Sequence, residues 1–129
     1  MSTRRAVVLG LAALMLTLVW APPSFAARQL HIYASVNHTH PASYTTVTVS
    51  CHARDQRGLA IEGVHVRFTW HFEQSTPVTK ARTDGTGSAL SKRGIGCPGK
   101  GFKVVITVRA TWKGQVKKTR THFYGSGST

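Results

Sequence analysis

Apolar and polar residues alternate along most of the chain after residue 27, with the period of two that is typical of a half-buried β-strand. In residues 64–72 the apolar side chains take every second position, and the residues between them are His65, Arg67, Thr69 and His71. No segment of useful length shows the period of 3.6 that an amphipathic helix requires. The pattern therefore predicts a domain built from strands alone.

Turn-forming residues divide this alternation into about seven segments, roughly 8–12 residues apart, which is the spacing typical of a β-sandwich. The predicted strands are residues 30–36, 46–53, 64–72, 77–83, 88–95, 102–112 and 115–124. The fold class expected from them is an all-β, immunoglobulin-like antiparallel sandwich, in which two sheets bury each other's apolar faces. The core is expected to centre on Val49, Phe68, Trp70, Val104, Ile106 and Val108.

The first 26 residues have the organisation of a secretory signal peptide. Arg4 and Arg5 precede a long apolar run, and small residues, Ser24 and Ala26, stand at the −3 and −1 positions of a cleavage site. An uncleaved anchor is the alternative, but the run is shorter than the ~20 residues that a bilayer span needs. The adjacent arginines leave both the general secretory and the twin-arginine export routes open. We therefore expect a signal peptide at 1–26, one domain at 27–124 and a flexible Gly/Ser tail at 125–129.

The chain contains two cysteines, Cys51 and Cys97, both in the exported part. An even pair in an oxidising compartment usually forms a disulfide, and a small domain gains stability from one. The sequence thus predicts a Cys51–Cys97 bridge. The alternative is two free thiols with a metal or redox role, which lacks a Cys-x-x-Cys spacing.

The composition is strongly basic, with 17 Lys and Arg against four Asp and Glu and a net charge of +13. Such a domain is attracted to polyanions such as nucleic acid, anionic glycans, teichoic acids or lipid headgroups, although high charge can also serve solubility alone. The basic residues are dense in the last two predicted strands and their turn. The candidate polyanion-binding residues are Lys113, Lys117, Lys118 and Arg120.

Catalytic and metal-binding patterns are absent from the sequence. There is no G-x-S-x-G motif for a serine nucleophile. Only four acids could serve as catalytic carboxylates, and Asp55 and Asp84 fall in predicted turns. The pair His38-x-His40 could share a metal ion only with ligands from elsewhere. We therefore expect no catalytic residues, no metal and no cofactor, and the protein is not expected to be an enzyme.

Two stretches resemble bacterial immunoglobulin-like domains of the invasin and intimin kind. They are residues 44–70 (YTTVTVSCHARDQRGLAIEGVHVRFTW) and residues 81–89 (ARTDGTGSA), which carry D-x-x-G, G-V-x-V and T-D-x-x-G elements. Carboxypeptidase regulatory-like and transthyretin-like sandwiches share the same turns. The resemblance implies a bacterial extracellular or cell-surface domain with a structural, adhesive or interaction role. A polyanion-binding module is the alternative function.

Overall fold

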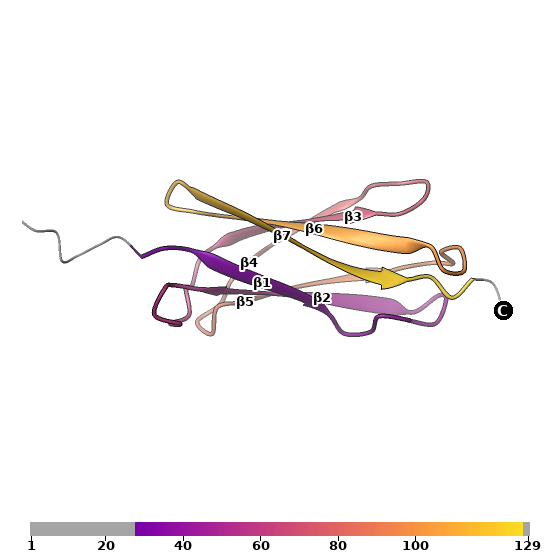
Figure 1. The fold of residues 1–129 in the computed structure, drawn as a ribbon, viewed down its shortest axis with the longest axis horizontal. Helices are drawn as coiled ribbons and strands as arrows, with labels where there is room; N and C mark the ends of the chain where they lie inside the picture. Colours follow the sequence, from indigo (N-terminus) through magenta and orange to yellow (C-terminus); the bar gives the residue numbers. More distant parts are fainter. Residues whose placement is uncertain (1–27, 128–129) are drawn as a thin grey trace, which may run out of the picture.

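The computed structural model describes residues 28–127 as two layers of antiparallel strands (Figure 1). The predicted signal peptide, residues 1–26, lies outside the described residues. The strands are β1 (His31–Val36), β2 (Thr46–Arg54), β3 (His65–His71), β4 (Val78–Arg82), β5 (Ser88–Gly94), β6 (Lys103–Trp112) and β7 (Gln115–Tyr124). All seven predicted strands are therefore present, and the described chain contains no helix.

The seven strands form a three-stranded sheet of order β1-β2-β5 and a four-stranded sheet of order β4-β3-β6-β7. The prediction of an all-β sandwich is confirmed, and the arrangement is compatible with an immunoglobulin-like fold. It differs from constant-type antibody domains, in which the fourth strand joins the sheet of the first two. Here β4 pairs with β3 instead, from His65↔Arg82 to Thr69↔Val78.

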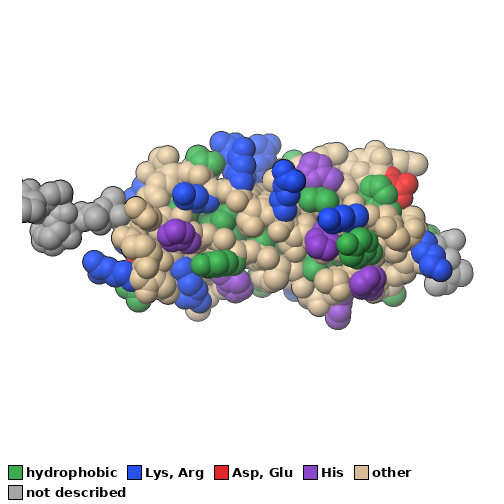
Figure 2. All heavy atoms as spheres, viewed as in Figure 1, with side chains coloured by type: hydrophobic (Ala, Val, Ile, Leu, Met, Phe, Trp, Pro, Cys, Tyr) green, Lys and Arg blue, Asp and Glu red, His purple; other side chains and the backbone are tan. Residues whose placement is uncertain are grey.

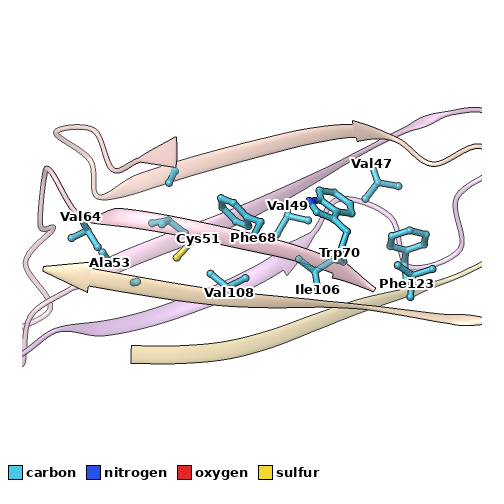
Figure 3. Close-up of a cluster of buried hydrophobic side chains, with 14 of the residues drawn as sticks. Val47, Val49, Cys51, Ala53, Val64, Phe68, Trp70, Ile106, Val108 and Phe123 are labelled. Carbon is cyan, nitrogen blue, oxygen red and sulfur yellow. The ribbon is translucent and has the colours of Figure 1, made fainter. Parts of the chain in front are cut away.

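The core lies between the inner faces of the two sheets, where the alternation of β2, β3 and β6 buries every second residue. Trp70, Phe68 and Phe123 are the largest of its fully buried side chains (Figure 3). The six core residues expected from the sequence are all fully buried: Val49, Phe68, Trp70, Val104, Ile106 and Val108.

Hydrogen bonds that involve side chains close the two open sides of the sandwich. On one side, the amide of Gln115 in β7 accepts from the Leu30 N–H at 2.8 Å and donates to the Arg28 carbonyl at 2.7 Å. On the other side, the Trp70 indole donates to the Thr79 hydroxyl, which also contacts the Ser91 hydroxyl. These hydrogen bonds satisfy polar groups at the rim of the core. Thr79 with Ser91 joins β4 to β5 of the other sheet, and Gln115 joins β7 to the residues just before β1.

The predicted Cys51–Cys97 disulfide is not formed, and both cysteines are free thiols. Cys51 lies in the middle of β2, buried among the core side chains (Figure 3), whereas Cys97 is exposed in the loop after β5. The Gly96 carbonyl accepts from the N–H of Tyr44, seven residues before Cys51. At about 3.3 Å per residue the two cysteines are therefore roughly 20 Å apart. A disulfide needs Cα atoms about 4.4–6.8 Å apart, so the prediction was wrong.

The described end of the chain is held against the loops at one end of the sandwich. Gly125 donates from its N–H to the Phe102 carbonyl, and Gly127 donates to the Pro98 carbonyl. The Ser126 hydroxyl donates to the Pro41 carbonyl at 2.6 Å. Residues 125–127 thus form hydrogen bonds with these loops, and the flexible tail expected at 125–129 stays a prediction.

Candidate functional site

The structure separates the four predicted polyanion-binding residues into different surroundings. Lys118 and Arg120 project from the outer side of β7, because they lie opposite Arg109 and Thr107, which are outward-facing residues of β6. Lys117 lies opposite the buried Ala110 and therefore projects from the inner side of β7, at the edge of the sheet. One strand thus sends neighbouring lysines to opposite sides, as strand geometry requires.

Lys113 belongs to the turn between β6 and β7. It has a φ of 47° and Gly114 has a φ of 77°, the left-handed pair that a two-residue type I′ hairpin requires. Its ammonium lies 4.9 Å from the centre of the Trp112 ring, and the Arg28 guanidinium lies 5.7 Å from the same ring. Lys113 is therefore part of a cation–π cluster at the hairpin end, apart from the outward-facing Lys118 and Arg120.

A single row of cationic side chains crosses the outer face of the four-stranded sheet. Lys80 of β4 lies opposite Arg67 of β3, Arg67 lies opposite Arg109 of β6, and Arg109 lies opposite Lys118 of β7. Directly opposite residues of an antiparallel pair project to the same side, with neighbouring strands about 4.8 Å apart. Four positive charges therefore stand side by side across the whole width of the sheet.

Two further arginines extend this row at its ends. Arg82 follows Lys80 on the outer side of β4, and Arg120 follows Lys118 on the outer side of β7. We call the six residues the basic face: Arg67, Lys80, Arg82, Arg109, Lys118 and Arg120. All six are exposed, and in Figure 2 Lys and Arg side chains project above the four-stranded layer.

The carboxylates of the described chain are elsewhere, in loops and turns. Among residues 28–127 the single ion pair joins Arg28 Nε to Asp55 Oδ2 at 2.8 Å. Asp84 caps its turn by accepting from the N–H groups of Thr86 and Ser88, while Glu73 accepts from the Gly99 N–H. No residue of the basic face has an ion-pair partner within the described chain. Like charges directly opposite each other destabilise a sheet, so the row costs stability that nothing beside it offsets.

Hydrogen bonding controls the pKa of both turn aspartates. Burial raises the pKa of Asp55, but donation from the Leu59 N–H, the Arg28 guanidinium and the Arg57 N–H outweighs it and holds the pKa below its ordinary value. Hydrogen bonds from the Thr86 hydroxyl and from the Ser88 and Thr86 N–H groups likewise lower the pKa of Asp84. These carboxylates are structural, in agreement with the turn role expected for Asp84.

A depression of about 470 Å³ lies on the basic face, between β4, β3 and β6. The outward side chains that line it are His65, Arg67, Lys80, Arg82, Arg109 and Thr111. Arg67, Lys80 and Arg82 were not among the predicted site residues, because they belong to strands distant in sequence from the basic hairpin. Their outward alternation was visible in the sequence, but which strand pairs with which was not.

The remaining candidate chemistry is sparse in the described chain. The His40 ring stacks on Tyr124 at 5.3 Å, and residues 28–127 contain no group of three or more His, Cys, Asp or Glu placed to hold a metal ion. Burial raises the pKa of the Cys51 thiol to about 11, which disfavours its reactive thiolate. No helix among these residues has the length and hydrophobicity needed to cross a membrane.

Comparisons with known proteins leave the basic face as the principal guide to function. No protein-family model matches the chain, and a search of curated proteins finds no match.

Proposed function

We propose that this protein is an exported, non-enzymatic immunoglobulin-like domain that binds a polyanion through its basic face. The observation that carries the proposal is the row Lys80–Arg67–Arg109–Lys118, which the described chain leaves without a single carboxylate partner. A sandwich needs only polar side chains on this surface, so four aligned cations are more than the fold requires. A bound polyanion would supply the missing negative charge.

The physical mechanism is charge neutralisation with release of counterions. A linear polyanion concentrates cations from solution around itself, and basic side chains that replace them return those ions to the solvent. The basic face offers up to six such contacts across the four strands. Binding of this kind is strong at low salt and falls steeply as salt increases.

Export and the bacterial resemblance supply the setting for this proposal. Residues 1–26 have the organisation of a signal peptide, and residues 44–70 and 81–89 resemble invasin- and intimin-type domains. We place the protein outside the cell or at its surface, where anionic polymers are accessible. The domain would then bind such a polymer without changing the polymer chemically.

The test is a pair of single substitutions in adjacent residues of β7. Binding of a fluorescent single-stranded oligodeoxythymidylate, as a generic polyanion, is measured by anisotropy over a range of salt concentrations. Lys118→Gln should weaken binding and make the slope of log K against log salt shallower by about 0.7, the value for one contact to a single strand. Lys117→Gln removes the same charge from the other side of the strand and should leave the slope unchanged. Equal effects of the two substitutions would show that binding depends on net charge alone, and would contradict a binding face.

A further inference from the structure

The two ends of the basic face differ in charge density. At the β7 end the outward cations of the edge strand are Lys118 and Arg120. At the other end four permanent cations surround the depression of about 470 Å³. Three of them are arginines, Arg67, Arg82 and Arg109, and Lys80 is the fourth.

The register places the backbones of these four residues close together. Arg67 lies opposite both Lys80 and Arg109, at one strand spacing of about 4.8 Å on either side. Arg82 is two residues from Lys80 on the same side of β4, which is roughly 7 Å along the strand. The Thr111 hydroxyl and the His65 imidazole complete the lining, and His65 lies opposite both Arg82 and Thr111.

This concentration exceeds what one phosphodiester unit requires, since each such unit carries a single negative charge. A phosphate monoester carries about −1.5 to −2 at pH 7 and presents three strong acceptor oxygens. Guanidinium groups bind such oxygens in a bidentate manner, which a lysine does not. Three arginines around one depression therefore match a dianionic, tetrahedral group better than a row of single charges.

We propose that the depression binds a terminal phosphate monoester, and that the chain attached to it crosses β6 towards Lys118 and Arg120. This inference rests on the proposed polyanion binding and adds to it a ligand group and a direction. The monoester lies among Arg67, Arg82 and Arg109, with the Thr111 hydroxyl as an additional donor. The monoanionic units that follow it lie along the second half of the row.

Two oligodeoxythymidylates of equal length, one with a 5′-phosphate and one with a 5′-hydroxyl, test the inference. The 5′-phosphorylated strand should bind the full chain roughly tenfold more tightly, the effect of a net gain of about one charge-assisted hydrogen bond. Arg82→Gln should reduce this ratio to about one. Lys118→Gln should weaken both strands and leave the ratio near ten. Since both residues are exposed, an unfolding midpoint no lower than that of the parent will show that each variant folds.

The outcomes separate this inference from the proposed function. Equal binding of the two strands, with a steep salt dependence, overturns the monoester site and leaves polyanion binding standing. If the ratio of the two affinities stays near ten in both Arg82→Gln and Arg67→Gln, the phosphate binds elsewhere, and the monoester site is again overturned. Failure of both strands to bind at low salt overturns the two proposals together.

Discussion

The two outer faces of the sandwich are built by the same alternation and yet differ in chemistry. On the three-stranded sheet several of the outward residues are small hydroxyls, with Ser35 opposite Ser50 and Ser50 opposite Leu90. Its two outward Lys and Arg residues, Arg54 and Lys92, lie in separate rows, opposite His31 and Thr48. On the four-stranded sheet the corresponding positions form the basic face.

This difference shows which part of the surface is explained by folding. Both sheets bury an apolar inner face, so the fold is satisfied by any polar outward residue. Neighbouring hydroxyls carry no net charge, whereas neighbouring cations repel one another. The basic face therefore carries a cost in stability that the other face avoids, and binding is the benefit that we propose for it.

The largest expected effect comes from removing two charges from one face or from the other. Arg67→Gln with Arg109→Gln should weaken oligodeoxythymidylate binding at low salt by at least about tenfold and make the salt slope shallower by about 1.4. Arg54→Gln with Lys92→Gln changes the net charge equally and should leave the slope nearly unchanged. Anisotropy titrations at several salt concentrations measure the affinity and the salt slope of both variants. A larger loss in the second variant would move the binding surface to the three-stranded sheet.

A charge reversal tests the cost in stability. Arg109→Glu places a carboxylate between Arg67 and Lys118, and each opposite-charge pair contributes about 0.2–1 kcal/mol. We expect the free energy of unfolding to rise by roughly 1 kcal/mol while polyanion binding falls. Urea denaturation measures the change. Ser50→Glu, which lies opposite Ser35 and Leu90, is the matched control and should bring no gain. Destabilisation by Arg109→Glu would show that the row carries no repulsive cost.

Acid should destabilise the protein through its turns, because the basic face holds no carboxylate. The folded state lowers the pKa of Asp55, so its contribution to stability is present above the ordinary pKa of about 3.9 and is lost as pH falls through the lower folded value. Thermal unfolding between pH 7 and pH 2.5 should show this loss below about pH 4. Asp55→Asn keeps an acceptor oxygen and should flatten the curve in that range. A variant curve parallel to that of the parent would assign the acid sensitivity to other groups.

The smallest expected effect concerns the turn lysine. Lys113→Asn places a residue that tolerates positive φ at a position with a φ of 47°. Relief of left-handed strain, worth about 1–2 kcal/mol, is partly offset by loss of the contact with Trp112, about 0.5–1 kcal/mol. We expect a net stabilisation of roughly 0.5 kcal/mol, seen as a small rise in Tm, with an unchanged salt slope. A slope that falls as much as in Lys118→Gln would add Lys113 to the binding face.

The strands could be predicted from the sequence because alternation is a local property. In residues 64–72 and 102–112 the alternation predicted, residue by residue, which side chains face the core. Even the short β4 and β5 lie within the expected ranges. The disulfide could not be predicted in the same way. Two cysteines suggested a bridge, but the pairing of β2 with β5 places Cys51 opposite Ala89 and carries Cys97 far beyond it.

The candidate site, too, could be predicted only where its residues are close in sequence. Lys118 and Arg120 were found because the basic hairpin is continuous in sequence, and Lys117 and Lys113 were grouped with them for the same reason. Strand direction and turn geometry then separated them. Arg67, Lys80 and Arg82 joined the face only through the registers of β3 with β4 and with β6.

The sequence by itself determined that the described chain forms strands, which side of each strand is apolar and that the protein is strongly basic. Each of these follows from residue types and their spacing, and none depends on a distant partner. The tertiary structure decided that β4 joins β3, that the two cysteines stay apart and that four cations from four strands form one row. Those features depend on register, and register is fixed only when the two sheets pack and one choice buries the apolar face of every strand at once.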